Sequence, residues 1–429
     1  MQLAVTRRDL FFSLLRVAIL SVPALAAAQS RPGVRSAKQV STKTSSSGTG
    51  TAGNQSFAGL EQGFIYFYNL EYGKAIRWFR EEVRRNPGSP GPYNHLAEAV
   101  LYRVLFRAGA LETQLVSGNN PFLRRAAAEM TEPEKAEFFA AIGKVFALTD
   151  AALATRPNDA DALYARGVAF GMRANYRFFV EKSWREALRD ATDARKLHNR
   201  VAELRPNFID ARFVQGAHDY LVGSLPFIYK MLGFLIGFRG DREAGIRTLE
   251  EVAEKGIRVR YDAKVLLCVI YRREDKDSAV KAIPLLRELI AAFPHNHLFF
   301  FELAQLYSDL GDEAAVIAVF EDMEKRMTRD PDFFHAMTPA RFAFAKGTFR
   351  FWYRYYPEAL AEFKLAVAGG DTMDLHTDVL AHMRLGQVYD MLGRREEALK
   401  AYRAAVALAP ESEVARESRG YLRRPFHRD

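Results

Sequence analysis

The chain has 429 residues, of which 49% are hydrophobic and 26% are charged, a composition that excludes a disordered polymer and supplies material for a packed core. Its 61 Lys and Arg exceed its 52 Asp and Glu, but charges of both signs are interspersed, which argues against nucleic-acid binding. The single cysteine, Cys268, excludes an intrachain disulfide, and its apolar surroundings predict a buried structural thiol.

An export signal is predicted over residues 1–28. Arg7 and Arg8 precede an apolar stretch that ends in small residues, with a cleavage site after Ala28. The order Thr-Arg-Arg-Asp-Leu-Phe resembles the twin-arginine export signal, with Leu10 where that family usually has Phe. The resemblance implies an exported protein of the periplasm or cell envelope. An uncleaved anchor and an ordinary secretory signal are the alternatives.

The segment between the signal and the fold is polar. Residues 29–56 are mostly Ser, Thr and Gly, which cannot bury enough surface to offset the entropy of ordering, so a disordered linker is predicted. The folded body is expected over residues 57–422. Residues 423–429 form a basic tail.

The clearest helical pattern lies near the C-terminus, in residues 379–412. Large apolar residues recur at helical spacing in two successive segments, which are separated at Gly393 and ended by Pro410. Small residues stand where two antiparallel helices would cross closely. The pattern resembles a tetratricopeptide repeat (TPR), which spans 34 positions. The matching residues are Leu385, Gly386, Tyr389, Ala398, Tyr402, Ala405 and Pro410.

The same pattern recurs upstream, starting at Ser56, Ala263, His297 and Ala340, with weaker half-units around Gly167 and Ala194. Insertions are expected at about residues 104–132, 172–182 and 223–240. The repeats therefore predict an all-α fold, a right-handed superhelical TPR solenoid of antiparallel helix pairs with helical insertions.

One insertion holds a fifteen-residue apolar run, 225–239, with a single charge, Lys230, before its last residue. A membrane crossing needs about twenty apolar residues, so the run is too short to span a bilayer. Three interpretations remain open: a helix packed into the solenoid, a surface that touches lipid or an apolar ligand, or a catalytic loop, which no accompanying nucleophile or acid–base set supports. The residues expected to contact lipid in the second case are Phe227, Leu232, Phe234 and Ile236.

Residues 209–330 resemble a eukaryotic family of TPR proteins related to the yeast inclusion-body clearance factor. The resemblance rests on Leu225-Pro226, the apolar run, and a Gly-x-x-Gly-Asp-Arg-Glu-x-Gly motif at 237–245. It implies a link to lipid handling and protein quality control, and no catalytic residue. In physical terms, the glycines of the motif permit tight turning and Asp241 can cap the next helix.

No motif in the sequence predicts catalysis. The phosphate-binding loop, the HExxH zinc motif, the CxxC pair and the GxSxG elbow are all missing, so catalytic residues, cofactors and metal sites are not expected. The pair His295 and His297 is unsuited to joint metal ligation, because the two side chains diverge on a helix. The stretch "FRFWYRYYPEAL" from Phe349 is interpreted mainly as core packing, with a partner-binding edge as the alternative.

The sequence thus predicts a non-enzymatic scaffold that binds a protein or peptide through its concave surface. Helix positions equivalent to those used by TPR grooves hold Glu302 and Gln305, and Arg384, Gln387 and Asp390 in the last repeat. A membrane-peripheral or lipid-binding protein is the alternative. The partner's identity and the oligomeric state are not predicted.

Overall fold

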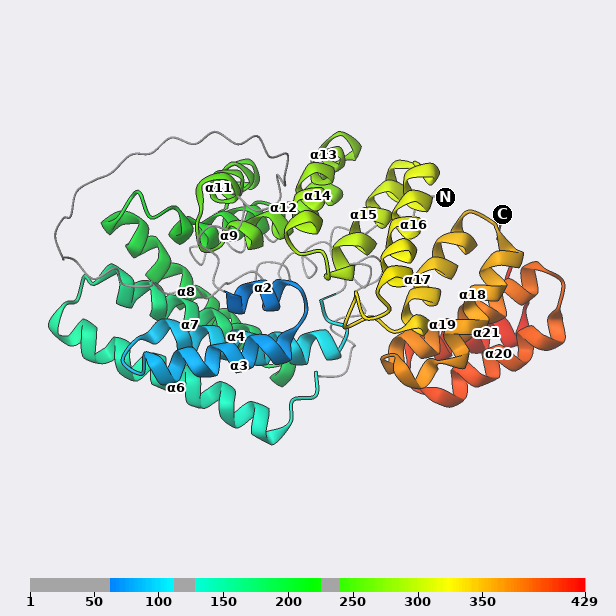
Figure 1. Cartoon of the computed structure of the whole chain (residues 1–429), viewed down its shortest axis with the longest axis horizontal. Helices are drawn as coiled ribbons and strands as arrows, with labels where there is room; N and C mark the ends of the chain where they lie inside the picture. Colours follow the sequence, from blue (N-terminus) through cyan, green and yellow to red (C-terminus); the bar gives the residue numbers. More distant parts are fainter. Residues whose placement is uncertain (1–61, 112–127, 225–239, 429) are drawn as a thin grey trace, which may run out of the picture. The chain divides into compact units, whose positions relative to one another are not determined.

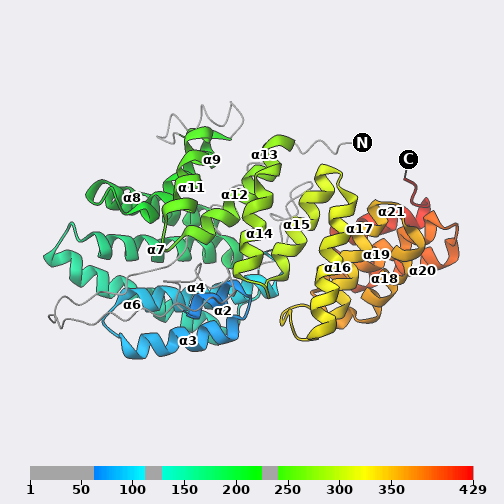
Figure 2. The same cartoon turned by 45° about the horizontal axis from the view of Figure 1, so that its top comes forward.

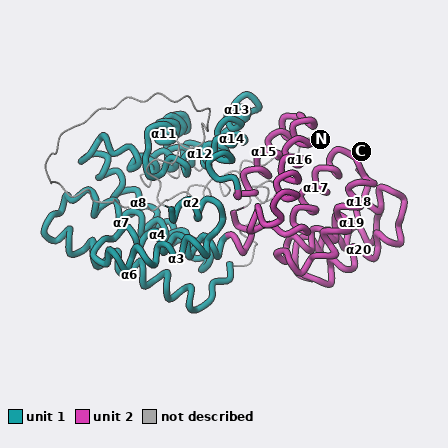
Figure 3. Tube along the Cα trace, in the orientation of Figure 1, with its two compact units in different colours: residues 1–105, 115–294 teal, residues 106–114, 295–429 magenta. Residues whose placement is uncertain are grey.

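Helices make up the regular structure of the protein. The computed structural model describes residues 62–111, 128–224 and 240–428, and those residues contain no strand (Figure 1). The predicted all-α class is therefore confirmed. The chain divides into two compact units, one of residues 1–105 and 115–294 and the other of residues 106–114 and 295–429 (Figure 3).

The first unit is built from antiparallel helix pairs. The packed pairs are α2 with α3, α7 with α8, α9 with α11, and α12 with α14, while the long helix α6 packs on α7. Its elements are α2 (Gln62–Tyr68), α3 (Tyr72–Arg85), α4 (Pro90–Arg107, whose last two residues fall in the second unit), α6 (Glu132–Thr155), α7 (Ala160–Tyr176), the π-helical turn η2 (Arg177–Glu181), α8 (Trp184–Leu204), the 3-10 turn η3 (Ile209–Arg212), α9 (Phe213–Gly223), α11 (Arg242–Lys255), α12 (Arg260–Glu274), α13 (Lys276–Val280) and α14 (Ala282–Ala292).

The second unit continues the pattern with three helix pairs and a final helix. The pairs α15–α16, α17–α18 and α19–α20 follow one another, and α21 packs on α20 and α19 (Figure 2). Their bounds are α15 (His297–Leu310), α16 (Glu313–Arg329), α17 (Pro339–Trp352), α18 (Tyr356–Ala368), the 3-10 turn η4 (Gly370–Thr372), α19 (Leu375–Met391), α20 (Arg395–Leu408) and α21 (Glu413–Arg423).

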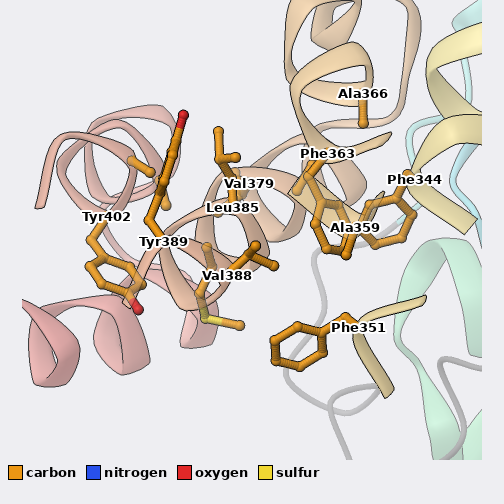
Figure 4. Packing of buried hydrophobic residues seen from close by; sticks show 14 of the residues in the cluster. Phe344, Phe351, Ala359, Phe363, Ala366, Val379, Leu385, Val388, Tyr389 and Tyr402 are labelled. Atoms are coloured by element: carbon orange, nitrogen blue, oxygen red, sulfur yellow. The ribbon is translucent and has the colours of Figure 1, made fainter. Parts of the chain in front are cut away.

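Small residues lie where paired helices cross, as the sequence predicts. A Cβ atom on Gly386 of α19 would lie 2.5 Å from the ring of Tyr402 on α20, so only glycine permits this approach. The Tyr402 ring is fully buried, as are Ala398 and Ala405 on either side of it. Figure 4 shows this core, which continues through Val388 to the helix pair before it.

In five helix pairs of the described structure, the turn between the two helices includes a residue with a left-handed backbone. Gly311 and Gly393 have φ angles of 82° and 72° between their paired helices. Leu70, Lys182 and Arg354 occupy the same place in three other pairs, with φ angles of 63°, 59° and 66°. A non-glycine residue is strained in this region. The shared geometry therefore marks these pairs as copies of one structural unit even where glycine is missing from the sequence.

Side-chain oxygens fix many of the helix starts. Thr131 and Glu134 form a reciprocal capping box at the start of α6. Asp241 accepts the backbone N–H of Ala244 at 3.0 Å, which confirms the capping role predicted for it. Asp210 of η3 accepts three backbone N–H groups at 2.8 to 3.0 Å, those of Ile257, Arg258 and Val259, and so ties η3 to the start of α12.

One helix in the described part of the chain, α6, is long and apolar enough to cross a membrane by length and composition. In the structure, 28% of its apolar window is buried. Core helices of non-membrane proteins meet the same criteria, and α6 packs Phe138 and Val145 into the first unit. Cys268 of α12 is buried, as expected for a structural thiol.

Candidate functional site

The site predicted on the last repeat lies on α19, the first helix of its pair. Asp390 is the centre of its hydrogen bonding, with a side chain that is 1% exposed. Its carboxylate accepts the Tyr402 hydroxyl at 2.9 Å and pairs with the Arg395 guanidinium at 2.9 and 3.1 Å. It also accepts the backbone N–H of Phe426 at 2.8 Å. Asp390 therefore joins α19, α20 and the C-terminal segment.

Arg384 and Gln387 lie about two turns and one turn of helix before Asp390. The Arg384 guanidinium donates to the Gln387 side-chain oxygen at 2.7 Å. It also lies over the rings of Phe351 and Trp352 of α17, 5.4 Å from each ring centre. Burial lowers the pKa of Arg384 below its ordinary value, because charged groups lose solvation in the interior.

Arg384 has unused binding capacity. Its buried Nε atom lacks a hydrogen-bond partner in the described structure. Within the described residues Arg384 also forms no ion pair with a carboxylate. A buried guanidinium N–H without an acceptor lowers the stability of the fold, and a ligand that supplies an acceptor would remove this cost. This places a cation with an open N–H at the junction of α17 and α19.

The C-terminal segment, residues 424–428, runs back from the end of α21 across α19 to α17. The Phe426 ring packs against Tyr421 and Phe351, with ring centres 5.4 and 5.9 Å apart. The Arg428 guanidinium donates to the Phe351 carbonyl at 2.9 Å and lies 4.7 Å from the centre of the Trp352 ring. The face that holds the predicted residues of α19 is thus occupied by the chain's own end.

We call this face the α17–α19 groove and define it by Phe351, Trp352, Arg384, Gln387 and Asp390. Phe351 and Gln387 are buried, whereas Trp352 is 43% exposed. The groove therefore combines a partly open aromatic ring, a stacked guanidinium and a carboxylate that accepts a backbone N–H. In the structure, Asp390, Phe351 and Trp352 contact residues 424–428 of the same chain.

Glu302 and Gln305 lie on α15, two helix pairs before α19 in the chain. Glu302 is buried, with 7% of its surface exposed, and Gln305 donates to Asp309 one turn later at 2.9 Å. Neither residue belongs to the α17–α19 groove. Their role in partner binding stays a prediction.

The two histidines near the start of α15 lie in different surroundings. His297 is buried against Phe106 and Phe301, and burial lowers its pKa to about 3. His295 faces Phe333 and stacks on His335. The two imidazoles therefore have different neighbours.

The residues predicted to touch lipid, Phe227, Leu232, Phe234 and Ile236, lie outside the described residues. The residues that flank this run, Gly223 before it and Gly240 after it, lie in close backbone contact. A Cβ atom on Gly223 would lie 2.2 Å from the backbone nitrogen of Arg242, and one on Gly240 would lie 2.8 Å from that of Gly223. The chain therefore leaves and re-enters the α9–α11 pair at one point, and the glycine at 240 in the sequence motif serves this approach.

Sequence reasoning found Arg384, Gln387 and Asp390 but missed Trp352 and Arg428 as parts of the same place. In the sequence, Trp352 belongs to the aromatic–arginine stretch at 349–355 and Arg428 belongs to the basic tail. Nothing in the spacing along the chain connects them, because the contact from Arg428 to Phe351 spans 77 positions.

The fold is that of an α-helical repeat protein, since antiparallel helix pairs of one design succeed each other in both units. Residues 379–412, which form α19 and α20, match the family model described as tetratricopeptide repeat. The α19–α20 pair is therefore a tetratricopeptide repeat, as the sequence pattern of these residues predicts.

Solved structures with similar arrangements include the APC/C hetero-tetramer Cut9-Hcn1, the human IFIT1 dimer with PPP-AAAA, and yeast Tom70. Identity to Cut9-Hcn1 is 14%, over 82% of this chain and 59% of that chain, with a TM-score of 0.36. For IFIT1 the values are 14%, 81%, 89% and 0.30, and for Tom70 they are 12%, 84%, 86% and 0.27. Likenesses this distant imply no shared partner or activity.

A comparison of the sequence with curated proteins gave no match. The relation of residues 209–330 to the family of the yeast inclusion-body clearance factor therefore stays a prediction.

Proposed function

We propose that the protein is an exported, non-enzymatic scaffold that binds a protein or peptide partner on the inner helix faces of its repeats. The observation that carries this proposal is the α17–α19 groove, which contacts residues 424–428 through a hydrogen bond from the Phe426 backbone to Asp390, the Phe426 ring on Phe351, and Arg428 on Trp352. A face that accommodates one extended peptide has the shape and chemistry to bind another.

Export belongs to the same proposal. The support is the order of residues 6–11 and the small residues before Ala28. Replacing Arg7 and Arg8 by lysine is expected to leave the uncleaved precursor in the cytoplasm, because the twin-arginine route requires both guanidinium groups. Fractionation followed by immunoblotting measures this, and unchanged export would exclude the twin-arginine route.

Partner binding is tested with Trp352→Ala. Asp390 is unsuitable for this purpose because it joins α19 to α20, and Gln387 is unsuitable because it is buried. Trp352 is partly exposed, so its loss removes ring surface from the groove while the core stays intact. We expect capture of the partner from cell-envelope extracts to fall at least tenfold, at an unchanged melting temperature.

The matched control is Trp184→Ala, which removes an even more exposed tryptophan, 58% against 43%, from α8 in the first unit. Its capture is expected to equal that of the wild type. Equal capture by both variants would contradict a partner site in the groove, and loss in both would indicate non-specific adhesion through exposed rings.

The second candidate is a membrane-peripheral protein, which the apolar composition of α6 and of residues 225–239 favours. In this function Phe227, Leu232, Phe234 and Ile236 contact lipid. Flotation with anionic liposomes separates the two candidates. A peptide scaffold stays at the bottom of the gradient, whereas a lipid-binding protein floats and loses flotation when the four residues are changed to aspartate.

A further inference from the structure

We propose that residues 424–428 are an internal peptide ligand of the α17–α19 groove, and that the external partner is an extended peptide with an aromatic and a basic residue spaced as Phe426 and Arg428 are. This inference rests on the proposed function and deepens it by naming the chemistry of the partner. It also makes the C-terminal segment a competitor that the partner must displace.

The first argument is the mode of contact at Phe426. Within residues 424–428, the group that donates to Asp390 is the backbone N–H of Phe426, at 2.8 Å. A backbone donor is present in every peptide except at proline, so this bond recognises an extended strand of chain rather than a particular residue. Asp390 is held in place for this purpose by Arg395 and Tyr402.

The second argument concerns side-chain selection. The Phe426 ring lies between Tyr421 and Phe351, and the Arg428 guanidinium lies against Trp352. Both side chains also lie near the Phe351 ring: the Phe426 ring centre is 5.9 Å from its centre and the Arg428 guanidinium is 5.8 Å from it. The groove therefore accommodates an aromatic residue and a cation at positions i and i+2.

The third argument is how the segment is anchored. Arg395 donates to the carbonyl oxygens of Tyr421 and Leu422 at 2.8 and 3.1 Å, which fixes the end of α21. After α21 the Arg424 backbone N–H donates to the Gly420 carbonyl at 3.1 Å, and the rest of the described segment is attached at Phe426 and Arg428 by the contacts given above. We infer that this segment can leave the groove while α21 stays in place, because its attachments are separate from those of the helix.

The internal segment leaves a hydrogen-bond donor of Arg384 unused. Arg428 and Arg384 lie over the same two rings, so the segment brings a second cation to this face. Within the described residues neither arginine is paired with a carboxylate. A partner that places an acceptor on the free Arg384 Nε gains a bond that the internal segment does not make.

The test uses the full chain, a variant that ends at Arg423, and a fluorescent peptide with the sequence of residues 424–429. A tethered ligand competes at an effective concentration on the order of millimolar. We expect the shortened protein to bind the peptide, and the full chain to bind it at least tenfold more weakly. Fluorescence anisotropy measures both affinities.

Two controls define the site. A peptide with Phe426→Ala and Arg428→Ala is expected to bind the shortened protein at least tenfold more weakly than the native peptide. The shortened protein carrying Trp352→Ala is expected to lose binding to a similar extent. Equal affinity for both peptides, or equal affinity of the full and shortened chains for the native peptide, would overturn the inference.

Circular dichroism shows whether the shortened chain is folded. If it is not, the same measurement is made on the full chain with Arg428→Ala, which loosens the segment but keeps Phe426 and α21. A gain in peptide affinity over the wild type supports the inference, and no gain overturns it. If the shortened protein binds the peptide but capture from the cell envelope gives no partner that depends on Trp352, the proposed function is refuted and the internal-ligand inference stands.

Discussion

Gly245→Val is expected to lower the free energy of unfolding by about 3 kcal/mol or more, the upper end of the usual cost of adding volume to a packed core. Gly245 lies on α11 where this helix crosses α9. A Cβ atom there would lie 2.4 Å from the backbone nitrogen of Tyr220 and 2.7 Å from the carbonyl oxygen of Gly216. Backbone atoms cannot rotate away, so the two helices would have to separate.

Urea unfolding followed by circular dichroism measures the loss. The matched control is Gly143→Val on α6, where a Cβ atom would meet nothing within 4 Å. Because valine is a slightly better helix former than glycine, this control is expected to stay within about 0.5 kcal/mol of the wild type. A Gly245→Val protein as stable as the control would show that α9 and α11 do not cross closely in solution.

The helix pairs could be predicted because their crossings demand small residues at fixed spacing. Gly386 opposite Tyr402 and Gly63 opposite Phe79 follow directly from the repeat pattern. The pattern was weaker in residues 160–204, where it gave two half-units. The structure joins them into one pair in which Gly167 lies against His198. The π-helical turn at 177–181 interrupts the regular spacing between α7 and α8, so the repeat pattern does not show them as one pair.

Only some of the left-handed turns could be predicted from the sequence. Gly311 and Gly393 could be recognised as turn residues from sequence, since glycine adopts positive φ freely. Leu70, Lys182 and Arg354 adopt the same conformation because the packed helices on either side impose it. No local property of these three residues predicts it.

The candidate site was predictable only in part, for a geometric reason. The position of Arg384, Gln387 and Asp390 on the first helix of a pair follows from helical periodicity. The return of residues 424–428 to this face depends on where α21 ends and on the carbonyl bonds of Arg395. That path is a property of the tertiary fold, so the sequence pattern did not include it.

Acid is expected to destabilise the first unit through its buried histidines. Burial lowers the pKa of His95 to about 3 and that of His198 to about 4. Both imidazoles are therefore neutral in the folded protein but take up a proton on unfolding below the ordinary pKa of 6.5. Their contribution to stability is complete above pH 6.5 and is lost as the pH falls toward the folded values.

The side chain of His198 shows why burial disfavours its charge. The ring packs on Tyr164, with centres 4.9 Å apart, and neither ring nitrogen has a hydrogen-bond partner in the described structure. A proton added there would be desolvated without compensation. The difference between pKa values of 6.5 and about 4 corresponds to roughly 3 kcal/mol lost by pH 4.

Asp262 acts in the opposite direction. Burial is the main cause that raises its pKa to about 7, although the Tyr68 hydroxyl donates to it at 2.6 Å. The folded protein therefore binds this proton more tightly than the unfolded chain does, and stability is lost as the pH rises from about 4 to about 7. One carboxyl group opposes two imidazoles in the same unit, so the net expectation is loss of stability in acid.

Two variants separate these contributions. His198→Leu removes a titrating group from the core, so its stability relative to the wild type is expected to rise by about 2 to 3 kcal/mol between pH 7 and pH 4.5. Asp262→Asn keeps an acceptor for Tyr68 and removes the opposing group, so its relative stability is expected to fall over the same interval. Urea unfolding at a series of pH values gives both differences. Parallel pH profiles for His198→Leu and the wild type would show that the buried imidazole gains a proton without cost, which is incompatible with a dry crossing of α7 and α8.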